Sequence, residues 1–321
     1  MKIAVDVMGG DHAPREIIAG ALKWSQEAAS TVLLVGKEAV INEELINFNY
    51  NPAWVEIVNA AEVIGMEESP ALALRRKKDA SIVVATKLVK EKRADCLLSC
   101  GSTGAQMAAA IFILGRMEGI ERPPLITAIP NLSGAFTFLI DLGASVDCKS
   151  KQLVQFAFLG SAYAQLTLNI KNPRTALLSN GTEETKGNSI TVEAHNLLKQ
   201  QKNINFIGNV EGRDIFNNSA DVIVCDGFTG NIVLKTIEGL AAFIAEAILK
   251  ETGKLPQLFK QLDYTQIGGA PLLGVEGISI VCHGSSKREA VYNGMRIAEK
   301  SCQDDIVTAQ KKALSFIEGN D

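Results

Sequence analysis

The chain alternates short apolar runs with longer stretches in which apolar residues recur every three or four positions. Each run leads into a loop rich in Gly, Asp, Ser and Thr, and then into an amphipathic stretch of helical spacing. Five such units have their apolar runs at residues 3–7, 95–99, 175–178, 222–225 and 278–282. Apolar runs that alternate with helices are typical of a mostly parallel sheet covered on both faces. We therefore predict a three-layer α/β/α protein.

No linker or change of composition divides the 321 residues. We predict a single α/β catalytic domain over residues 1–321 that contains subdomains. Residues 237–262 show helical spacing broken near Gly253, which predicts a helical hairpin within this domain. The hairpin could pack on its own core or on a partner subunit. Alternatively, its apolar face could rest on an anionic membrane surface, with Lys254 and Lys260 beside it.

Composition and charge exclude several classes of protein. Hydrophobic residues make up 47% of the chain, charged residues 21%, and the net charge is −4. A nucleic-acid binder would concentrate basic residues, so we predict no nucleic-acid partner. The six cysteines form no CxxC pair, which argues against a metal ribbon or a disulfide framework. The N-terminus does not resemble a secretory signal, which predicts a cytoplasmic protein, and the long uncharged runs hold too many polar groups for an integral membrane span.

The Gly-rich loops are the candidate sites of chemistry. In a parallel sheet they lie beyond the carboxyl ends of the strands, so we expect all five to gather at one edge. A helix that starts after such a loop offers unpaired N–H groups and the positive end of its dipole to phosphate. Candidate phosphate-binding residues are Gly101, Ser102, Thr103, Gly104, Gly227, Thr229, Gly230 and Ser285. Neither GxGxxG nor GxxxxGK[ST] occurs, so the motifs give no support for a dinucleotide or P-loop site.

Five ionisable side chains lie in or near these loops, and each could either take part in chemistry or have only a structural role. Lys186 is either a surface lysine or a cation aimed at an anion. His12 and His283 could transfer protons or cap loops, whereas the helical spacing around His195 predicts a core position. Asp226 could be a helix cap or a turn residue.

The first loop raises the same question. Asp6 and Asp11, together with Gly9 and Gly10, could form a turn or cap a helix. No spacing rule supports a metal held by these aspartates or by Asp226, so we predict no metal site.

Cysteines at the strand ends are possible acyl-transfer nucleophiles. A reactive thiol needs an electropositive, partly open setting. For Cys100, Cys225 and Cys282 we expect the alternative, a buried structural thiol.

Taken in order, the loops resemble those of one family, the bacterial phosphate:acyl-[acyl carrier protein] acyltransferases (PlsX). The longest match is DVIVCDGFTGNIVLK at residues 221–235. Two family loops appear in altered form, with SCGSTGA at 99–105 in place of SAGNTGA and DLGAS at 141–145 in place of DVGAN. The other matching stretches are residues 3–6, 8–14, 75–78, 80–81, 181–183, 186–188, 205–210, 264, 268–270 and 283–286.

The resemblance implies a fold similar to phosphotransacetylase and isopropylmalate dehydrogenase, and a homodimer without a cofactor. It implies that long-chain acyl-[acyl carrier protein] and inorganic phosphate give acyl phosphate and free carrier. The acyl phosphate would feed a membrane-bound glycerol-3-phosphate acyltransferase on the way to phosphatidic acid. Peripheral membrane contact, direct or through that enzyme, is a further expectation. The acidic carrier would dock on a basic surface, for which residues 75–78 and 254–260 are candidates, although both could be ordinary solvated faces.

In this reaction phosphate is itself the nucleophile, so the site must orient phosphate against the thioester and stabilise an oxyanion. We assign phosphate anchoring to Lys186 and the loop N–H groups. Asn231 or Ser285 would donate to the oxyanion, and His283, or else His12, would protonate the leaving thiolate. Three alternatives remain, namely a phosphotransacetylase-like enzyme that uses acyl-CoA, a decarboxylating dehydrogenase, and a non-catalytic regulator that binds the carrier.

Overall fold

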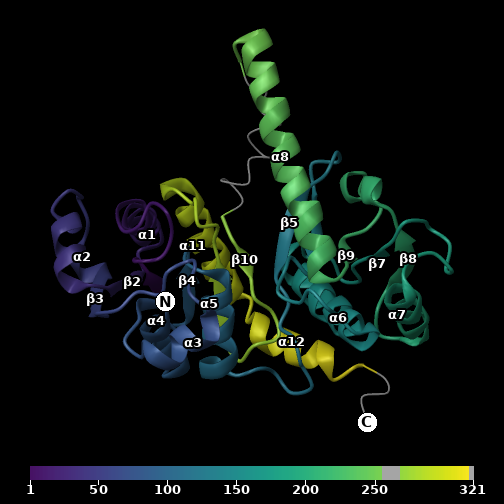
Figure 1. The fold of residues 1–321 in the computed structure, drawn as a ribbon, viewed down its shortest axis with the longest axis horizontal. Helices are drawn as coiled ribbons and strands as arrows, with labels where there is room; N and C mark the ends of the chain where they lie inside the picture. The colour runs from purple at the N-terminus through teal and green to yellow at the C-terminus, as the bar shows by residue number, and fades with distance from the viewer. Residues whose placement is uncertain (255–267, 318–321) are drawn as a thin grey trace. The chain divides into compact units, whose positions relative to one another are not determined.

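The computed structural model describes residues 1–254 and 268–317, which fall into two compact units (Figure 1). The described part of unit 1 comprises residues 1–116 and 268–303. That of unit 2 comprises residues 117–254 and 304–317. That these units act as subdomains of one catalytic domain stays a prediction.

Unit 1 is built on a six-stranded sheet of order β10-β11-β4-β1-β2-β3. All neighbours pair in parallel except β10, which is antiparallel to β11. The interior of the central strands is fully buried, as the apolar runs predict. The strands are β1 (Lys2–Asp6), β2 (Thr31–Gly36), β3 (Val55–Asn59), β4 (Cys96–Ser99), β10 (Ala270–Pro271) and β11 (Ile278–Val281).

Helices cover both faces of this sheet. Figure 1 shows α1 (Arg15–Ala28) and α11 (Arg288–Gln303) packed together on one face, with α4 (Ser81–Lys90) and α5 (Thr103–Ala109) on the other. A π-helical turn, η2 (Ala110–Leu114), continues α5. The remaining helices are α2 (Glu38–Leu45), α3 (Pro70–Arg76) and the short η1 (Pro52–Trp54).

Ser69 followed by Pro70 is a typical helix start and predicts one helix through Arg93, but this prediction is wrong. Helix α3 ends at Arg76 and α4 begins at Ser81. The break arises because Ala80 forms a parallel bridge with Glu62, and the Ser81 N–H donates to the Glu62 carbonyl at 3.0 Å. A backbone held in a bridge cannot also continue a helical turn.

Unit 2 has its own five-stranded sheet, of order β5-β6-β9-β7-β8, in which only β5 and β6 are antiparallel. Helix α6 (Ser150–Thr167) is buried on most of its surface and packs against β9, α7 and α12. It covers most of the long uncharged run at residues 152–170, whose polar residues predict a buried helix of this kind. The strands are β5 (Ile126–Pro130), β6 (Phe136–Ile140), β7 (Thr175–Leu178), β8 (Phe206–Val210) and β9 (Val222–Val224). The other helices are α7 (Ser189–Gln200), α8 (Gly227–Thr252), α12 (Ile306–Leu314) and the short η3 (Gly212–Phe216).

The two sheets confirm the mostly parallel α/β class, but the prediction that five loops share one edge is wrong. The loops after β1, β4 and β11 lie at the carboxyl edge of the unit 1 sheet. Those after β7 and β9 lie at the edge of the unit 2 sheet, because these strands pair with each other and with β6 and β8.

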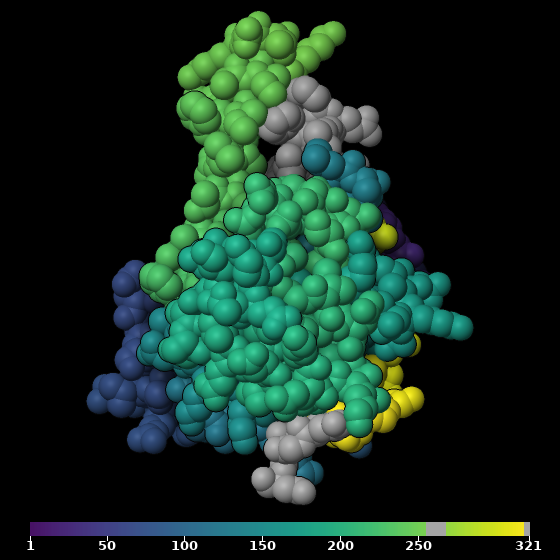
Figure 2. Space-filling model, turned by 90° about the vertical axis from the view of Figure 1, so that its right-hand side faces the viewer, coloured from purple at the N-terminus to yellow at the C-terminus, as the bar shows by residue number. Residues whose placement is uncertain are grey.

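Helix α8 is the first arm of the predicted hairpin and ends at Gly253, whose left-handed backbone (φ +69°) is typical of a helix C-cap. The second arm, with Lys260 and Tyr264, lies outside the described residues. Only Gly227 and Gly230 of α8 are buried, and Figures 1 and 2 show its C-terminal half standing clear of the other described elements of unit 2. Its large exposed apolar side chains are Phe228, Ile232, Leu240, Phe243 and Leu249.

Across the part of the chain that the structure describes, no helix combines the length and the apolar character needed to cross a membrane.

Candidate functional site

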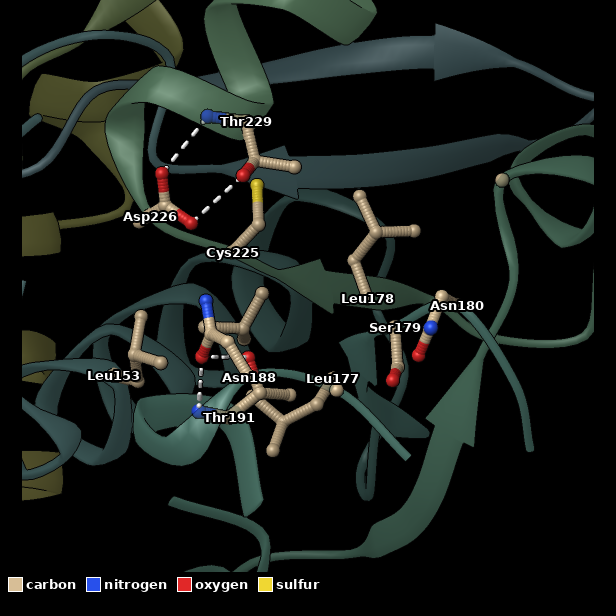
Figure 3. A pocket seen from close by; sticks show the side chains of 13 residues that line it. Leu153, Leu177, Leu178, Ser179, Asn180, Asn188, Thr191, Cys225, Asp226 and Thr229 are labelled. Carbon is tan, nitrogen blue, oxygen red and sulfur yellow. Dashed lines mark hydrogen bonds between the residues drawn. The ribbon is translucent and has the colours of Figure 1, made fainter. Parts of the chain in front are cut away.

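A pocket of about 540 Å³ opens in unit 2 at the carboxyl ends of β7 and β9 (Figure 3). Its apolar lining comes from Leu153, Leu177, Leu178, Val224 and Cys225. The starts of α7 and α8 both border it, and each presents a hydrogen-bonded pair of side chains in Figure 3. The remaining lining residues are Ser179, Asn180, Gly187, Asn188, Thr191, Gly212, Asp226 and Thr229.

Helix α7 begins at this pocket with free backbone donors. Its N-cap, Asn188, accepts hydrogen bonds through Oδ1 from the Thr191 N–H at 2.9 Å and the Thr191 hydroxyl at 3.1 Å. Within residues 1–254 and 268–317, the N–H groups of residues 187–190 find no acceptor. The cap is uncharged, so this helix end keeps its full attraction for an anion.

Lys186 immediately precedes these donors. Its side chain is exposed, and no carboxylate in the described part of the chain pairs with it. The aliphatic side chain of Lys186 passes over Gly181, where a Cβ would lie only 2.7 Å from Lys186 Cγ. Glycine at 181 therefore allows the lysine to lie along the loop that follows β7. Glu184, close by in sequence, is held by Lys199 at 2.6 Å.

Helix α8 begins at the same pocket, but the N–H groups of Gly227, Thr229 and Gly230 already have acceptors. The N-cap Asp226 accepts from the Thr229 N–H through Oδ1 and from the Thr229 hydroxyl through Oδ2, both at 2.8 Å. The Gly227 N–H donates to the Ser145 carbonyl at 2.8 Å, and the Gly230 N–H to the Asp226 carbonyl at 2.9 Å. The backbone of Gly227, Thr229 and Gly230 therefore has no N–H left for phosphate, and the Asp226 carboxylate opposes an anion there.

The close packing of α8 comes from the loop after β6. Asp141 is fully buried, and its carboxylate accepts four backbone N–H groups, from Leu125, Leu142, Ala144 and Ser145. Burial raises the pKa of Asp141 to about 6, although these hydrogen bonds act in the opposite direction. A Cβ at Gly230 would lie 1.9 Å from the Asp141 carbonyl oxygen, so only glycine fits. In the sequence, Asp141 belongs to the family loop DLGAS at 141–145 and no role is predicted for it, although its place after an apolar run was an available signal.

Asn231 lies in the first turn of α8 and is exposed. Its side chain sits beside Gly143, where a Cβ would be 3.5 Å from Asn231 Cβ. Asn231 therefore borders the loop of residues 141–145, and it is not among the residues that line the pocket.

In unit 1 the loops after β1 and β4 are tied together by one buried carboxylate. Asp6 accepts from the Ser99 hydroxyl at 2.8 Å and from the Met8 N–H at 3.2 Å. The Gly101 N–H in turn donates to the Ser99 hydroxyl at 3.0 Å. Burial raises the pKa of Asp6, whereas its hydrogen bonds lower it. Asp6 thus holds the two loops together through hydrogen bonds. Gly9 allows this close packing, because a Cβ there would lie only 2.9 Å from Asp6 Oδ2.

The loop after β11 is hydrogen-bonded to the loop after β1 at the carboxyl edge of the unit 1 sheet. The Asp11 N–H donates to the Gly284 carbonyl at 2.8 Å, and Gly10, next to Asp11, has a left-handed backbone (φ +104°). The Nδ1 atom of His283 lies 2.8 Å from Ser285 Oγ and accepts from the Ser285 N–H at 3.2 Å. With Nδ1 accepting, the hydrogen-bond pattern assigns the proton of the neutral ring to Nε2.

Unit 1 also retains free donors at the start of α5. The N-cap Ser102 accepts weakly from the Ala105 N–H at 3.4 Å. The N–H groups of Ser102, Thr103 and Gly104 meet no acceptor among the residues described. His12, in the loop after β1, is half-buried, and no hydrogen bond of its ring is found within the same residues.

The predicted site residues thus divide between the units. Unit 2 holds Lys186, Asp226, Gly227, Thr229, Gly230 and Asn231. Unit 1 holds Asp6, Gly9, Gly10, Asp11, His12, Gly101, Ser102, Thr103, Gly104, His283 and Ser285.

The structural interpretation of the cysteines and of His195 is confirmed. Cys100, Cys225 and Cys282 are buried. A hydrogen bond to Cys282 and burial raise the pKa of the Cys100 thiol, and burial raises that of Cys225, so neither is poised as a thiolate. His195 is buried, with Nδ1 2.9 Å from Asn209 Oδ1.

The carboxylate oxygens of Asp6 and Asp226 accept hydrogen bonds from neighbouring groups of the protein. Over residues 1–254 and 268–317, no three His, Cys, Asp or Glu side chains come together as a group that could hold a metal ion.

Comparison with solved structures defines the class of fold. The chain resembles EutD phosphotransacetylase from Staphylococcus aureus, with a TM-score of 0.62, 18% identity, and 97% and 94% of the two chains covered. It also resembles a 4-hydroxythreonine-4-phosphate dehydrogenase from Klebsiella pneumoniae, with a TM-score of 0.55, 12% identity and 98% and 99% coverage. The fold is therefore the α/β fold of phosphotransacetylases and these dehydrogenases, which confirms the predicted similarity to phosphotransacetylase.

Sequence comparison then gives the family. The model of the family described as fatty acid synthesis protein matches residues 1–309. A phosphate acyltransferase of Syntrophomonas wolfei is 63% identical, with 99% of this chain and 100% of the relative covered, and one of Desulforamulus reducens is 47% identical with 99% of both covered. The chain belongs to the phosphate acyltransferase (PlsX) family of enzymes, as the loop motifs predict.

Proposed function

We propose that this enzyme transfers a long-chain acyl group from acyl carrier protein to inorganic phosphate, and so releases acyl phosphate and the free carrier thiol. The acyl phosphate would then supply a membrane glycerol-3-phosphate acyltransferase on the way to phosphatidic acid. The observation that carries the proposal is the start of α7. Gly187, Asn188 and Thr191 line a pocket there, Lys186 directly precedes them in the chain, and the N–H groups of residues 187–190 meet no acceptor among the described residues. Such a cluster suits a small anion such as phosphate.

This geometry leads us to place phosphate at α7 and not at α8. At α8 the Asp226 carboxylate would repel phosphate, and the donors of Gly227, Thr229 and Gly230 are occupied. At α7 the neutral Asn188 leaves the helix dipole and Lys186 to balance the anion's charge. The N–H groups of residues 102–104 remain a second candidate anion position.

The proposed reaction needs no covalent intermediate on the enzyme. A phosphate oxygen attacks the thioester carbonyl carbon, a C–O bond forms, and the carbonyl electron pair moves onto its oxygen. Collapse of this tetrahedral species restores the carbonyl and breaks the C–S bond, with the electron pair leaving on sulfur. Lys186 and the α7 donors hold phosphate in position, which converts an encounter in solution into an oriented attack.

Two further roles complete the proposal. Asn231 or Ser285 donates a hydrogen bond to the oxyanion of the tetrahedral species. The thiolate receives a proton from the imidazolium form of His283, in which Nδ1–H donates to Ser285 Oγ at 2.8 Å and Nε2–H is the proton given up, and His12 is the second choice.

A direct assay tests the proposed function. Purified enzyme is incubated with acyl carrier thioester, with and without phosphate, and hydroxylamine traps any acyl phosphate as the hydroxamate. We expect thiol release and hydroxamate only when phosphate is present. Thiol release that ignores phosphate would contradict the proposal, and carrier binding without turnover would indicate a regulator instead.

A second candidate is a transfer from acyl-CoA, which the likeness to EutD phosphotransacetylase favours. The same assay with acyl-CoA and acyl carrier thioesters of one chain length distinguishes the two donors. The proposal requires a higher kcat/KM for the carrier thioester.

We further propose a homodimer in which the apolar surface of α8 is covered by the second copy. Phe243 on α8 is 70% exposed and Leu240 is 55% exposed, which is costly for apolar side chains unless another surface covers them. Sedimentation of the Phe243→Glu variant tests this, with a monomer as the expected result. Peripheral membrane contact through the region after Lys254 is a separate proposal, tested by flotation with anionic vesicles.

A further inference from the structure

The outer surface of α3 and α4 in unit 1 carries several basic side chains that form no ion pair among the described residues. Arg75, Arg76 and Lys78 are exposed, and within the described residues none of them forms an ion pair. Lys87 of α4 is also exposed and lies beside Lys78, since its Nζ donates to the Lys78 carbonyl at 3.3 Å. Lys77 differs from the others, because Glu68 pairs with it at 2.6 Å.

Among the neighbouring acidic residues, Glu68 is the one for which an ion pair with a basic residue of this surface is found within the described residues. Glu68 holds Lys77 and also accepts the Gly65 N–H, which lowers the pKa of its carboxyl. Glu62 accepts the Asp79 N–H, and Asp79 accepts the Ala61 N–H. The positive charge of Arg75, Arg76, Lys78 and Lys87 is therefore presented to solvent even though the whole chain carries a net charge of −4.

Two large apolar side chains are exposed on α3 and on η2, which contacts α4. Leu72 is 52% exposed and lies three and four residues before Arg75 and Arg76, so all three share one side of α3. Phe112, on the turn η2, is 71% exposed. The elements are neighbours in Figure 1, where α3 lies along α5, the helix that η2 continues. Helix α4 is tied to η2 by a hydrogen bond, because Lys90 Nζ donates to the Leu114 carbonyl at the end of η2.

We call this surface the basic apolar face, and define it by Leu72, Arg75, Arg76, Lys78, Lys87 and Phe112. It adjoins the unpaired donors of unit 1. A Cβ at Gly104, in the first turn of α5, would lie 2.8 Å from Pro70 Cγ at the start of α3. A protein bound on α3 would therefore sit next to the free N–H groups of residues 102–104.

We infer that the basic apolar face docks the acidic surface of the acyl carrier protein, an inference that rests on the proposed function. Unneutralised arginines and lysines attract an acidic partner over a distance and raise its rate of association. Leu72 and Phe112 supply the apolar contacts around which the energy of an interface concentrates. The carrier's thioester is covalently attached to the carrier, so docking the protein also delivers the substrate to unit 1.

Reversal of charge on α3 tests the inference. The double variant Arg75→Glu/Arg76→Glu is compared with the wild-type enzyme for binding of an acyl carrier protein whose acyl group is joined by a non-transferable amide. Fluorescence anisotropy gives Kd, and the turnover assay gives KM and kcat. We expect Kd and the KM for the carrier thioester to rise by about tenfold or more, with kcat at saturation within about twofold.

Matched controls separate docking from general electrostatics and from folding. The variant Lys37→Glu/Lys171→Glu makes the same change of charge at exposed lysines away from the face, and its Kd should stay within about twofold of the wild type. Phe112→Ala removes apolar contact without changing charge, and should weaken binding with little change in its salt dependence. An unchanged melting temperature shows that each variant is folded.

Three outcomes would overturn the inference. In the first, Arg75→Glu/Arg76→Glu binds the carrier as tightly as the wild type. In the second, the control variant loses binding equally. In the third, carrier binding is retained while binding to phosphatidylglycerol vesicles is lost, which would make the face a membrane contact. Failure of the proposed function looks different, because the wild type would then form no acyl phosphate whatever its affinity for the carrier.

Discussion

Helices α7 and α8 start at the same pocket and look alike at their first residues, yet they differ in what they can bind. Each has an Asx N-cap that accepts the N–H and the hydroxyl of the threonine three residues later. The start of α7 keeps a neutral cap, unpaired N–H groups and Lys186. The start of α8 has a charged cap, and its Gly227 N–H donates to the Ser145 carbonyl, whereas the equivalent Ser189 N–H of α7 meets no acceptor among the described residues.

The difference shows that a glycine-rich loop before a helix serves two purposes. At α8 the glycines allow the first turn to pack against the loop of residues 141–145, so the helix is anchored. At α7 the loop stays open, and the dipole and N–H groups remain available to a ligand. The number of free donors, and not the number of glycines, decides which of the two helices suits an anion.

The largest effect is expected at the closed start of α8. Gly230→Ala would put a Cβ 1.9 Å from the Asp141 carbonyl oxygen, so the backbone must shift. We expect a loss of more than about 3 kcal/mol in the free energy of unfolding, measured by urea denaturation. The control Gly239→Ala lies on the same helix with no atom within 4 Å of the added Cβ, and should be neutral or stabilising by about 1 kcal/mol. Equal stability of the two variants would show that α8 is not anchored in this way.

The second effect concerns the buried carboxyl that organises this anchor. The folded-state pKa of Asp141 is about 6, above the ordinary aspartate value of 3.8. The folded protein therefore keeps a proton that the unfolded chain releases between about pH 4 and pH 6. The free energy of unfolding therefore falls as pH rises through this window, and it is highest below it. The difference corresponds to roughly 3 kcal/mol at most.

Denaturation of the Asp141→Asn variant at pH values from 4 to 7 measures this contribution. The wild-type free energy of unfolding, relative to that of the variant, should fall with rising pH. The exposed Asp147→Asn serves as control and should show no such trend. Parallel pH profiles for the wild type and Asp141→Asn would rule out the raised pKa.

The third effect is expected at the start of α7, where removal of Lys186 should weaken the binding of phosphate. Lys186→Ala should raise the KM for phosphate by about 10–100-fold, because a charge-assisted contact to the anion is lost. The side chain is exposed, so the melting temperature should change little. Lys202→Ala, at another exposed lysine beyond α7, should leave the KM unchanged. A normal KM in Lys186→Ala would remove the proposed phosphate anchor.

The smallest effect comes from exchanging the charges of the two caps. Asn188→Asp keeps a good N-cap but adds a negative charge beside the proposed phosphate, so the KM should rise several-fold. Asp226→Asn should lower the KM slightly or leave it unchanged, with stability altered by about 1 kcal/mol or less. The reverse pattern, with phosphate affinity sensitive mainly to Asp226→Asn, would place the anion at α8 and overturn the comparison.

The periodicity of the sequence predicts much of the local structure. Apolar runs locate β1, β4, β7, β9 and β11 to within a residue or two, because strands buried on both faces have few polar positions. The family motifs predict the class of enzyme, since long ordered motifs constrain many loops at once. The helix break at residues 77–80 escapes prediction, because it depends on a bridge to Glu62 from a separate part of the chain.

The site residues were harder to rank from the sequence. Gly227, Thr229 and Gly230 carry the same signature as Ser102, Thr103 and Gly104, yet only the second group keeps free N–H groups. The acceptor for Gly227 is the carbonyl of Ser145, which lies in a different loop. No local pattern reveals such a partner, and the same is true of the partner of Lys77 in the basic run, Glu68.

The amino-acid sequence by itself determined the alternation of strands and helices, the glycine-rich turns and the family, because each depends on residues close together in the chain or on motifs in a fixed order. The tertiary structure decided the rest. Strand pairing distributed the loops over two sheets, and contacts between distant loops determined which N–H groups and which charges remain unpaired. Hydrogen bonds and ion pairs form between groups that are adjacent in space, and that adjacency exists only once the chain has folded.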